Sequence, residues 1–90
     1  MSALETLVNF VNIYSPAQGV EIRFSDVTKQ YYCSVPFDIK DRIFLKSISC
    51  HANTIEESAR ETLNTIKGKV LVFNLYGTNR KEVYYHKEPE

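Results

Sequence analysis

The residues of this chain best suited to chemistry are a neighbouring thiol and imidazole, Cys50 and His51. They lie near the start of the segment ISCHANTIEESARETL, just before a predicted helix. A thiol near a helix N-terminus loses its proton more easily, and an adjacent histidine can act as its base. Such a pair would perform nucleophilic catalysis.

A structural role explains the same two residues better. Neighbours in a strand point to opposite faces, so the two side chains would diverge. Cys50 continues the face that carries Ile48, a usual position for a small buried side chain. Asn53 and Thr54 separate the pair from the helix, which weakens the effect of the helix dipole on the thiol. We therefore predict a junction between a strand and a helix, with Cys50 under the helix and His51 pointing away from it.

Other catalytic and metal-binding patterns are missing from the sequence. Its two cysteines and two histidines show no C-x-x-C or H-x-x-x-H spacing, which argues against a zinc site. Its three glycines are scattered, so no glycine-rich phosphate loop is present. Two cysteines are too few for a disulfide scaffold, and reduced thiols are expected. We expect no enzymatic activity, no metal, no cofactor and no small-molecule substrate.

The composition indicates one small folded domain over residues 1–90, with a disordered tail at 87–90. Hydrophobic residues make up 43% and charged residues 24%, as in ordinary globular chains. Eleven basic and 11 acidic side chains give no net charge, which argues against strong binding of nucleic acid. The first residues do not resemble a signal peptide and no stretch is long enough to span a membrane, so a cytoplasmic protein is expected.

Two helices are predicted from capping signals and apolar spacing. Ser2 and Glu5 form a capping box at the start of the first helix, and Pro16 follows its end. Thr54 and Glu57 form a second capping box. The apolar stripe at helical spacing consists of Leu4, Leu7, Val8, Val11 and Tyr14 in the first helix, and of Ile55, Ala59, Thr62, Leu63 and Ile66 in the second.

Five strands are predicted from alternation and turn residues. They cover residues 20–25, 30–35, 42–50 (with a bulge near 46–47), 69–76 and 82–86. The predicted order is therefore α-β-β-β-α-β-β. Short connections between neighbouring strands favour an α+β fold, in which one antiparallel five-stranded sheet carries both helices on one face.

The order of the first five elements is similar to that of the double-stranded-RNA-binding domain. That family contacts phosphates with a lysine-rich start to its last helix, whereas the corresponding segment here, TIEESARE, is acidic. The resemblance is therefore not extended to RNA binding. A strand that leads into TIEESARETL also resembles the HicB-type antitoxin fold.

The sheet face opposite the helices is the predicted binding surface. In the first hairpin, alternation places one set of side chains under the helices, namely Ile22, Phe24, Tyr31, Cys33 and Val35. The opposite face carries Arg23, Gln30 and Tyr32. In the closing hairpin both alternating sets of side chains are apolar, and the bulkier set is assigned to the face under the helices: Leu71, Phe73 and Leu75. This assignment leaves Val70, Val72, Tyr76 and Tyr84 on the uncovered face.

Two interpretations of the outward tyrosines remain open. Tyrosine is enriched in binding surfaces, but aromatic residues also stabilise sheets by pairing across strands. Phe10 and Ile13 lie off the stripe of the first helix and suggest a second apolar patch of the kind found at interfaces. The predicted binding residues are Tyr32, Tyr76, Tyr84, Arg23, Val72, Phe10 and Ile13.

The function expected from these features is protein–protein contact without catalysis, as an adaptor, modulator or inhibitor. The partner is another protein or a second copy of the chain, and such a size would suit an accessory protein of a phage or mobile element. The alternative is a module that binds single-stranded nucleic acid. In that case the tyrosines would stack on bases while Arg23, Lys46 and Arg80 contact phosphate.

Overall fold

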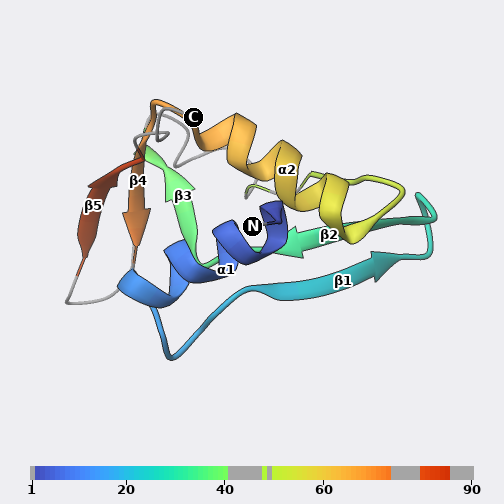
Figure 1. The fold of residues 1–90 in the computed structure, drawn as a ribbon, viewed down its shortest axis with the longest axis horizontal. Coiled ribbons are helices and arrows are strands. Elements are labelled where there is room, and N and C mark those ends of the chain that lie inside the picture. Colours follow the sequence, from blue (N-terminus) through green and yellow to red (C-terminus); the bar gives the residue numbers. More distant parts are fainter. Residues whose placement is uncertain (1, 41–47, 49, 74–79, 86–90) are drawn as a thin grey trace.

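The computed structural model describes residues 2–40, 48, 50–73 and 80–85, and shows an α+β fold (Figure 1). Its elements in chain order are α1 (Ala3–Tyr14), β1 (Glu21–Ser25), β2 (Gln30–Ser34), β3 (Phe37–Ile39), α2 (Ile55–Ile66), β4 (Val70–Phe73) and β5 (Lys81–Tyr84). The predicted α+β class is confirmed, and both predicted helices are present. In the described part of the chain, neither helix has the length and apolar character that a membrane crossing requires.

Both helices begin where the capping residues predict. The Glu5 backbone N–H donates to Ser2 Oγ over 3.1 Å, and the Ser2 N–H donates to the Glu5 carboxylate over 3.4 Å. At α2 the Glu57 N–H donates to Thr54 Oγ1 over 3.1 Å. Gly68 follows α2 with φ of 71°, a left-handed conformation that glycine adopts without steric cost. Local capping chemistry therefore fixes the helix limits.

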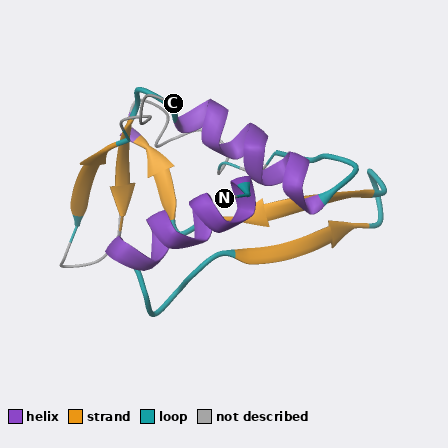
Figure 2. Cartoon of the chain, viewed as in Figure 1, coloured by secondary structure: helices purple, strands orange, loops and turns teal. Residues whose placement is uncertain are grey.

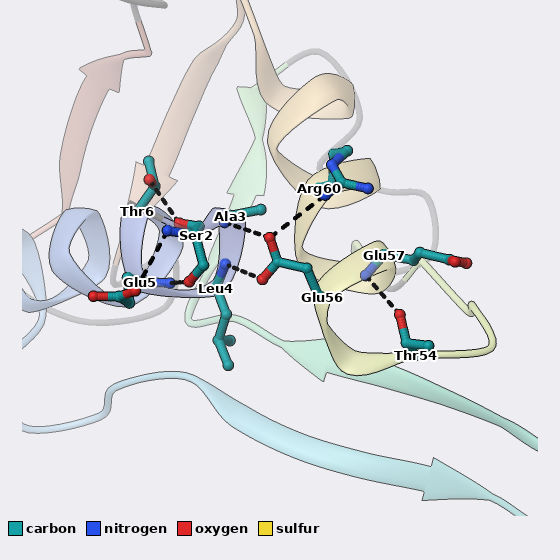
Figure 3. A network of polar contacts seen from close by, with 9 residues as sticks. All are labelled: Ser2, Ala3, Leu4, Glu5, Thr6, Thr54, Glu56, Glu57 and Arg60. Atoms are coloured by element: carbon teal, nitrogen blue, oxygen red, sulfur yellow. Dashed lines mark hydrogen bonds and ion pairs between the residues drawn. The ribbon is translucent and has the colours of Figure 1, made fainter.

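Glu56 joins α2 to the start of α1 (Figure 3). Its carboxylate accepts hydrogen bonds from the backbone N–H groups of Ala3, over 2.7 Å, and Leu4, over 3.2 Å. These two hydrogen bonds lower the pKa of Glu56. The positive charge of Arg60, whose guanidinium lies 3.6 Å from the Glu56 carboxylate, lowers it further. Because the pKa is lower in the folded state, the contact stabilises the fold at neutral pH, and this stabilisation is lost as pH falls through the folded pKa. An acidic side chain of one helix thus neutralises the positive end of the other.

The strands form two antiparallel sheets rather than the single five-stranded sheet that we predicted (Figure 2). One sheet contains β1 and β2, and the other has the order β3-β4-β5. The break lies between β2 and β3, at Val35 and Pro36. Proline has no backbone N–H to donate to a ladder, so it interrupts pairing and directs the chain from one sheet to the next.

The third strand is also placed differently from the prediction. β3 forms at Phe37–Ile39, which the sequence analysis treated as a break between strands. Of the predicted strand at 42–50, residues 42–47 and 49 lie outside the described residues, together with the predicted bulge. The two described residues of that segment, Ile48 and Cys50, are not in a strand. The predicted tail at 87–90 lies outside the described residues as well.

The core lies between the helices and the second sheet. Its buried members are Leu7 and Val11 of α1, Ala59 and Ile66 of α2, Cys33 of β2, Phe37 and Ile39 of β3, Leu71 and Phe73 of β4, and Ile48. The inward assignment of Leu71 and Phe73 is confirmed, while Leu75 lies outside the described residues. Most of the first sheet therefore contributes little to this cluster.

Phe10 belongs to an aromatic cluster and not to the exposed patch that we predicted. Its ring centroid lies 4.9 Å from that of Tyr85, 5.3 Å from Tyr14, and 6.1 Å from each of Phe37 and Phe73. The prediction is wrong because α1 packs against β3 and β4 with more than its narrow stripe, so that Phe10 meets rings from the second sheet. The side chain is half-buried.

Candidate protein-interaction surface

The β1–β2 hairpin is attached to the rest of the molecule through β2. Tyr31 exchanges two backbone hydrogen bonds with Ala52, each 2.9 Å long. The Cys33 N–H donates to Ser58 Oγ of α2 over 3.1 Å. These contacts hold one edge of the hairpin, and they show that the backbone groups of Tyr31 and Cys33 point away from β1.

One face of the hairpin carries apolar side chains that are only partly covered. Ile22 lies opposite Cys33 and Phe24 lies opposite Tyr31, so all four share a face. Cys33 is buried, whereas Ile22, Phe24 and Tyr31 are exposed, with 49% of Phe24 accessible. The rings of Phe24 and Tyr31 meet edge to face at 5.0 Å. Val27, in the turn at the hairpin tip, is 93% exposed.

We call Ile22, Phe24, Val27 and Tyr31 the hairpin patch. Three of these residues were predicted to lie under the helices, and that prediction is wrong. The helices cover the base of the hairpin at Cys33, where Ser58 of α2 contacts β2, but the strands extend beyond this point (Figure 1). Alternation correctly identified the side chains that share a face, but it did not indicate how far the helices reach.

Among the described residues, the outer edge of β1 has no strand partner. Opposite residues of an antiparallel pair alternate between those that exchange hydrogen bonds and those whose backbone groups point outward. Since Tyr31 and Cys33 direct these groups away from β1, their opposites Phe24 and Ile22 direct theirs away from β2. Within the described residues β1 pairs with β2 alone, and Figure 1 shows it at the margin of the molecule. The hairpin therefore combines an apolar face with an open edge.

The reverse face of the hairpin is polar. Arg23 forms an exposed ion pair with Glu21, and this hydrogen bond raises the pKa of Arg23. Tyr32 is half-buried and its ring lies 4.7 Å from that of His51, in a tilted stack. Arg23 and Tyr32 thus lie on the side that we predicted to face outward, but both already have partners within the chain.

The remaining predicted binding residues are dispersed. Val72 was predicted to be exposed, and this is wrong because only 1% of it is accessible. It lies on the central strand β4, flanked by Asp38 on β3 and Glu82 on β5. Tyr84 is exposed on β5, opposite Val70.

Ile13 and Tyr76 were also predicted to bind a partner. Ile13 is 70% exposed on α1, as expected, and Tyr76 lies outside the described residues. With Tyr32 on one sheet, Tyr84 on the other and Val72 buried, the predicted set does not form one continuous surface.

Cys50 and His51 precede α2 and their side chains diverge as predicted, but the strand predicted to lead into this junction is not present at Ile48 or Cys50. Cys50 Sγ lies 3.6 Å from Thr65 Oγ1 of α2, and its carbonyl accepts a 2.6 Å hydrogen bond from Ser58 Oγ. His51 turns to Tyr32 instead. Both cysteines are free thiols, and the described residues contain no cluster of three or more histidine, cysteine and acidic side chains that could hold a metal.

The hairpin patch was not among the predicted binding residues, although one feature of the sequence indicates it. Val27 is a β-branched apolar residue in the otherwise polar turn SDVTK, where a buried position is not expected. An apolar residue at such a tip indicates that the hairpin itself could contact a partner.

Comparisons with known proteins add no family to these observations. No protein-family model matches the chain, and searches of curated proteins and of solved structures find no similar protein.

Proposed function

We propose that this chain is a small protein-interaction domain that binds a protein through the hairpin patch. The observation that carries the proposal is the exposure of Ile22, Phe24 and Tyr31 on a hairpin whose other edge is fixed to the core. Adjoining exposed apolar side chains are a frequent mark of protein interfaces. Phenylalanine and tyrosine provide large contact area with few rotatable bonds, which limits the entropy lost on binding.

The attachment of the hairpin supports the same proposal. The bonds of β2 to Ala52 and Ser58 hold the strand in place, so the patch is presented on an ordered support. Little of the binding energy would then be spent on ordering the surface. An adaptor, modulator or inhibitor needs no more than such a surface.

No observed contact favours the alternative of single-stranded nucleic-acid binding. Arg23 and Arg80, two of the three cations predicted to contact phosphate, lie beside Glu21 and Glu82. Lys46 lies outside the described residues. Arg23 also points to the face opposite Phe24 and Tyr31, so the exposed rings and this cation would not meet the same strand.

Photo-crosslinking tests the proposal. A photoreactive benzoylphenylalanine at Phe24 is expected to form covalent adducts with a protein when the chain is expressed in cells of its source organism. The matched control carries the same group at Tyr84, which is 58% exposed but belongs to the other sheet. We expect protein adducts from position 24 and none from position 84.

The opposite pattern would contradict the proposal. Adducts from position 84 without adducts from position 24 would move the interface to β5. The absence of adducts at position 24 from a folded chain would mean that the hairpin patch is not a docking surface. Circular dichroism of both labelled chains verifies that they fold.

A further inference from the structure

The open edge of β1 indicates what kind of partner fits. An exposed edge strand pairs with another strand unless charge, proline or a bulge opposes it. β1 contains no proline, and its two charged residues, Glu21 and Arg23, are opposite in sign. The edge therefore lacks the net charge that commonly protects such strands.

Two copies of β1 can pair about a two-fold axis in only a few registers. The outward backbone groups belong to Ile22 and Phe24, and by alternation to Val20, so these residues must lie opposite one another. If the axis passes near residue 23, Arg23 lies opposite Arg23 of the other copy. If it passes near residue 21, the two copies of Glu21 meet. Both arrangements place like charges together.

The register centred on Ile22 removes this conflict. It places Ile22 opposite its own copy, Val20 opposite Phe24, and Glu21 opposite Arg23 of the other chain. The two-fold axis repeats each of these pairs, so two cross-strand ion pairs form. Opposite charges on facing residues favour pairing, whereas like charges oppose it. The segment VEIRF is thus complementary to itself in this antiparallel register.

The apolar side chains agree with the same register. Val20 packs against the core cluster, and if the alternation of β1 continues to this residue it shares the face of Ile22 and Phe24. Phe24 of the second copy would lie beside Val20 of the first, where it would cover an apolar border of the core. Ile22 and its copy would meet at the axis, so the two hairpin patches would join on one face of a four-stranded sheet.

We propose that the partner of the hairpin patch is a second copy of this chain, paired antiparallel through β1 with Glu21 opposite Arg23. This inference rests on the proposed function, since it names the protein that the patch binds. The resulting dimer is isologous: each chain contributes the same edge, and the pairing leaves no further β1 edge open.

Charge reversal with sedimentation equilibrium tests the register. We expect the wild-type chain to dimerise in a concentration-dependent way. Glu21→Arg or Arg23→Glu converts both ion pairs to like-charge pairs, and each should weaken dimerisation by roughly tenfold. The double variant with both reversals in one chain restores opposite charges in the proposed register, and its dimerisation should recover.

Mixing the two single variants excludes an effect inside one chain. Glu21 and Arg23 also pair within β1, and both single variants lose that pair. Only contact between different chains can therefore rescue them, and we expect the mixture to associate more tightly than either variant by itself. Arg80→Glu, which makes the same charge change as Arg23→Glu at a position just before β5, is the control and should leave dimerisation unchanged.

The outcomes separate this inference from the proposed function. A wild-type chain that stays monomeric at every concentration, or a double variant as weak as the single ones, would overturn the dimer in this register. If position 24 then still forms adducts with a different protein, the hairpin patch remains a docking surface. Loss of all adducts at position 24 would remove both proposals.

Discussion

Replacing Phe73 by alanine is expected to lower the free energy of unfolding by about 3–5 kcal/mol. Phe73 is fully buried, and its ring lies 5.1 Å from that of Phe37 and 5.5 Å from that of Tyr14. The truncation removes buried apolar area and leaves a cavity between α1 and β3, because the surrounding rings cannot close it completely. A domain whose total stability is about 5–15 kcal/mol would lose a large part of it.

Phe24→Ala is the matched control for this prediction. It makes the same chemical change at a ring that is half exposed on the hairpin, and it should cost about 1 kcal/mol or less, mainly from the contact with Tyr31. Urea unfolding of both variants at a dilution that favours the monomer gives the comparison. Equal losses would show that the hairpin patch is part of the core. If Phe73→Ala does not fold, Phe73→Leu should still lose about 1–2 kcal/mol.

Ser58→Ala is expected to destabilise the chain by about 2–4 kcal/mol. Ser58 is fully buried, accepts a hydrogen bond from the Cys33 N–H and donates one to the Cys50 carbonyl. Alanine would leave the buried Cys33 N–H without a hydrogen-bond acceptor. The half-buried Cys50 carbonyl would accept one hydrogen bond fewer. An unsatisfied buried group costs about 1–3 kcal/mol. The same side chain fixes the hairpin to α2, so the loss should be accompanied by looser attachment of β2.

Thr62→Val controls for the loss of a buried hydroxyl. Thr62 is equally buried in α2, but its hydroxyl donates to the Ser58 carbonyl of the same helix, four residues before it. That carbonyl keeps its main-chain helical partner, and the cost should be about 1 kcal/mol or less. Thermal unfolding of both variants measures the difference. An equal cost for the two would show that the link from α2 to the hairpin contributes no more than an ordinary buried hydroxyl.

The local structure was largely predictable from the sequence. Helix limits depend on capping residues that act within one turn, such as Ser2 with Glu5, and the first hairpin depends on short-range alternation. The divergent side chains of Cys50 and His51 were predicted in the same way, although the strand expected before them is not present at Ile48 or Cys50. These features need only neighbours in sequence, so a single chain shows them.

The assembly of the sheets was less predictable, because it depends on contacts far apart in sequence. Alternation shows which residues share a face, but not which strands become neighbours, and β3 at Phe37–Ile39 is too short to show a pattern. The burial of Val72 did have a signal: the unbroken apolar run VLVF is typical of a central strand buried on both faces. Assigning one half of that run to solvent was the mistake.

The exposure of the hairpin patch could not be predicted from the strands themselves. Ile22 and Phe24 have the alternation of a half-buried strand, but the start of α2 contacts the hairpin at Cys33 and leaves these two residues exposed. A pattern that normally indicates a core face here marks a surface that remains available to a partner. The same sequence property therefore supports the proposed dimer, in which these residues become buried.

The central claim is that the edge of β1 is open in a single chain and is covered by a second one. Amide hydrogen exchange, followed residue by residue with NMR over a range of protein concentrations, tests it directly. The account predicts that the Ile22 and Phe24 amides exchange quickly in the dilute monomer and become protected as the concentration rises, while the Arg23 amide, which faces β2, is protected throughout. Protection of Ile22 and Phe24 in the dilute monomer would show that another part of the same chain covers the edge, and would contradict the account.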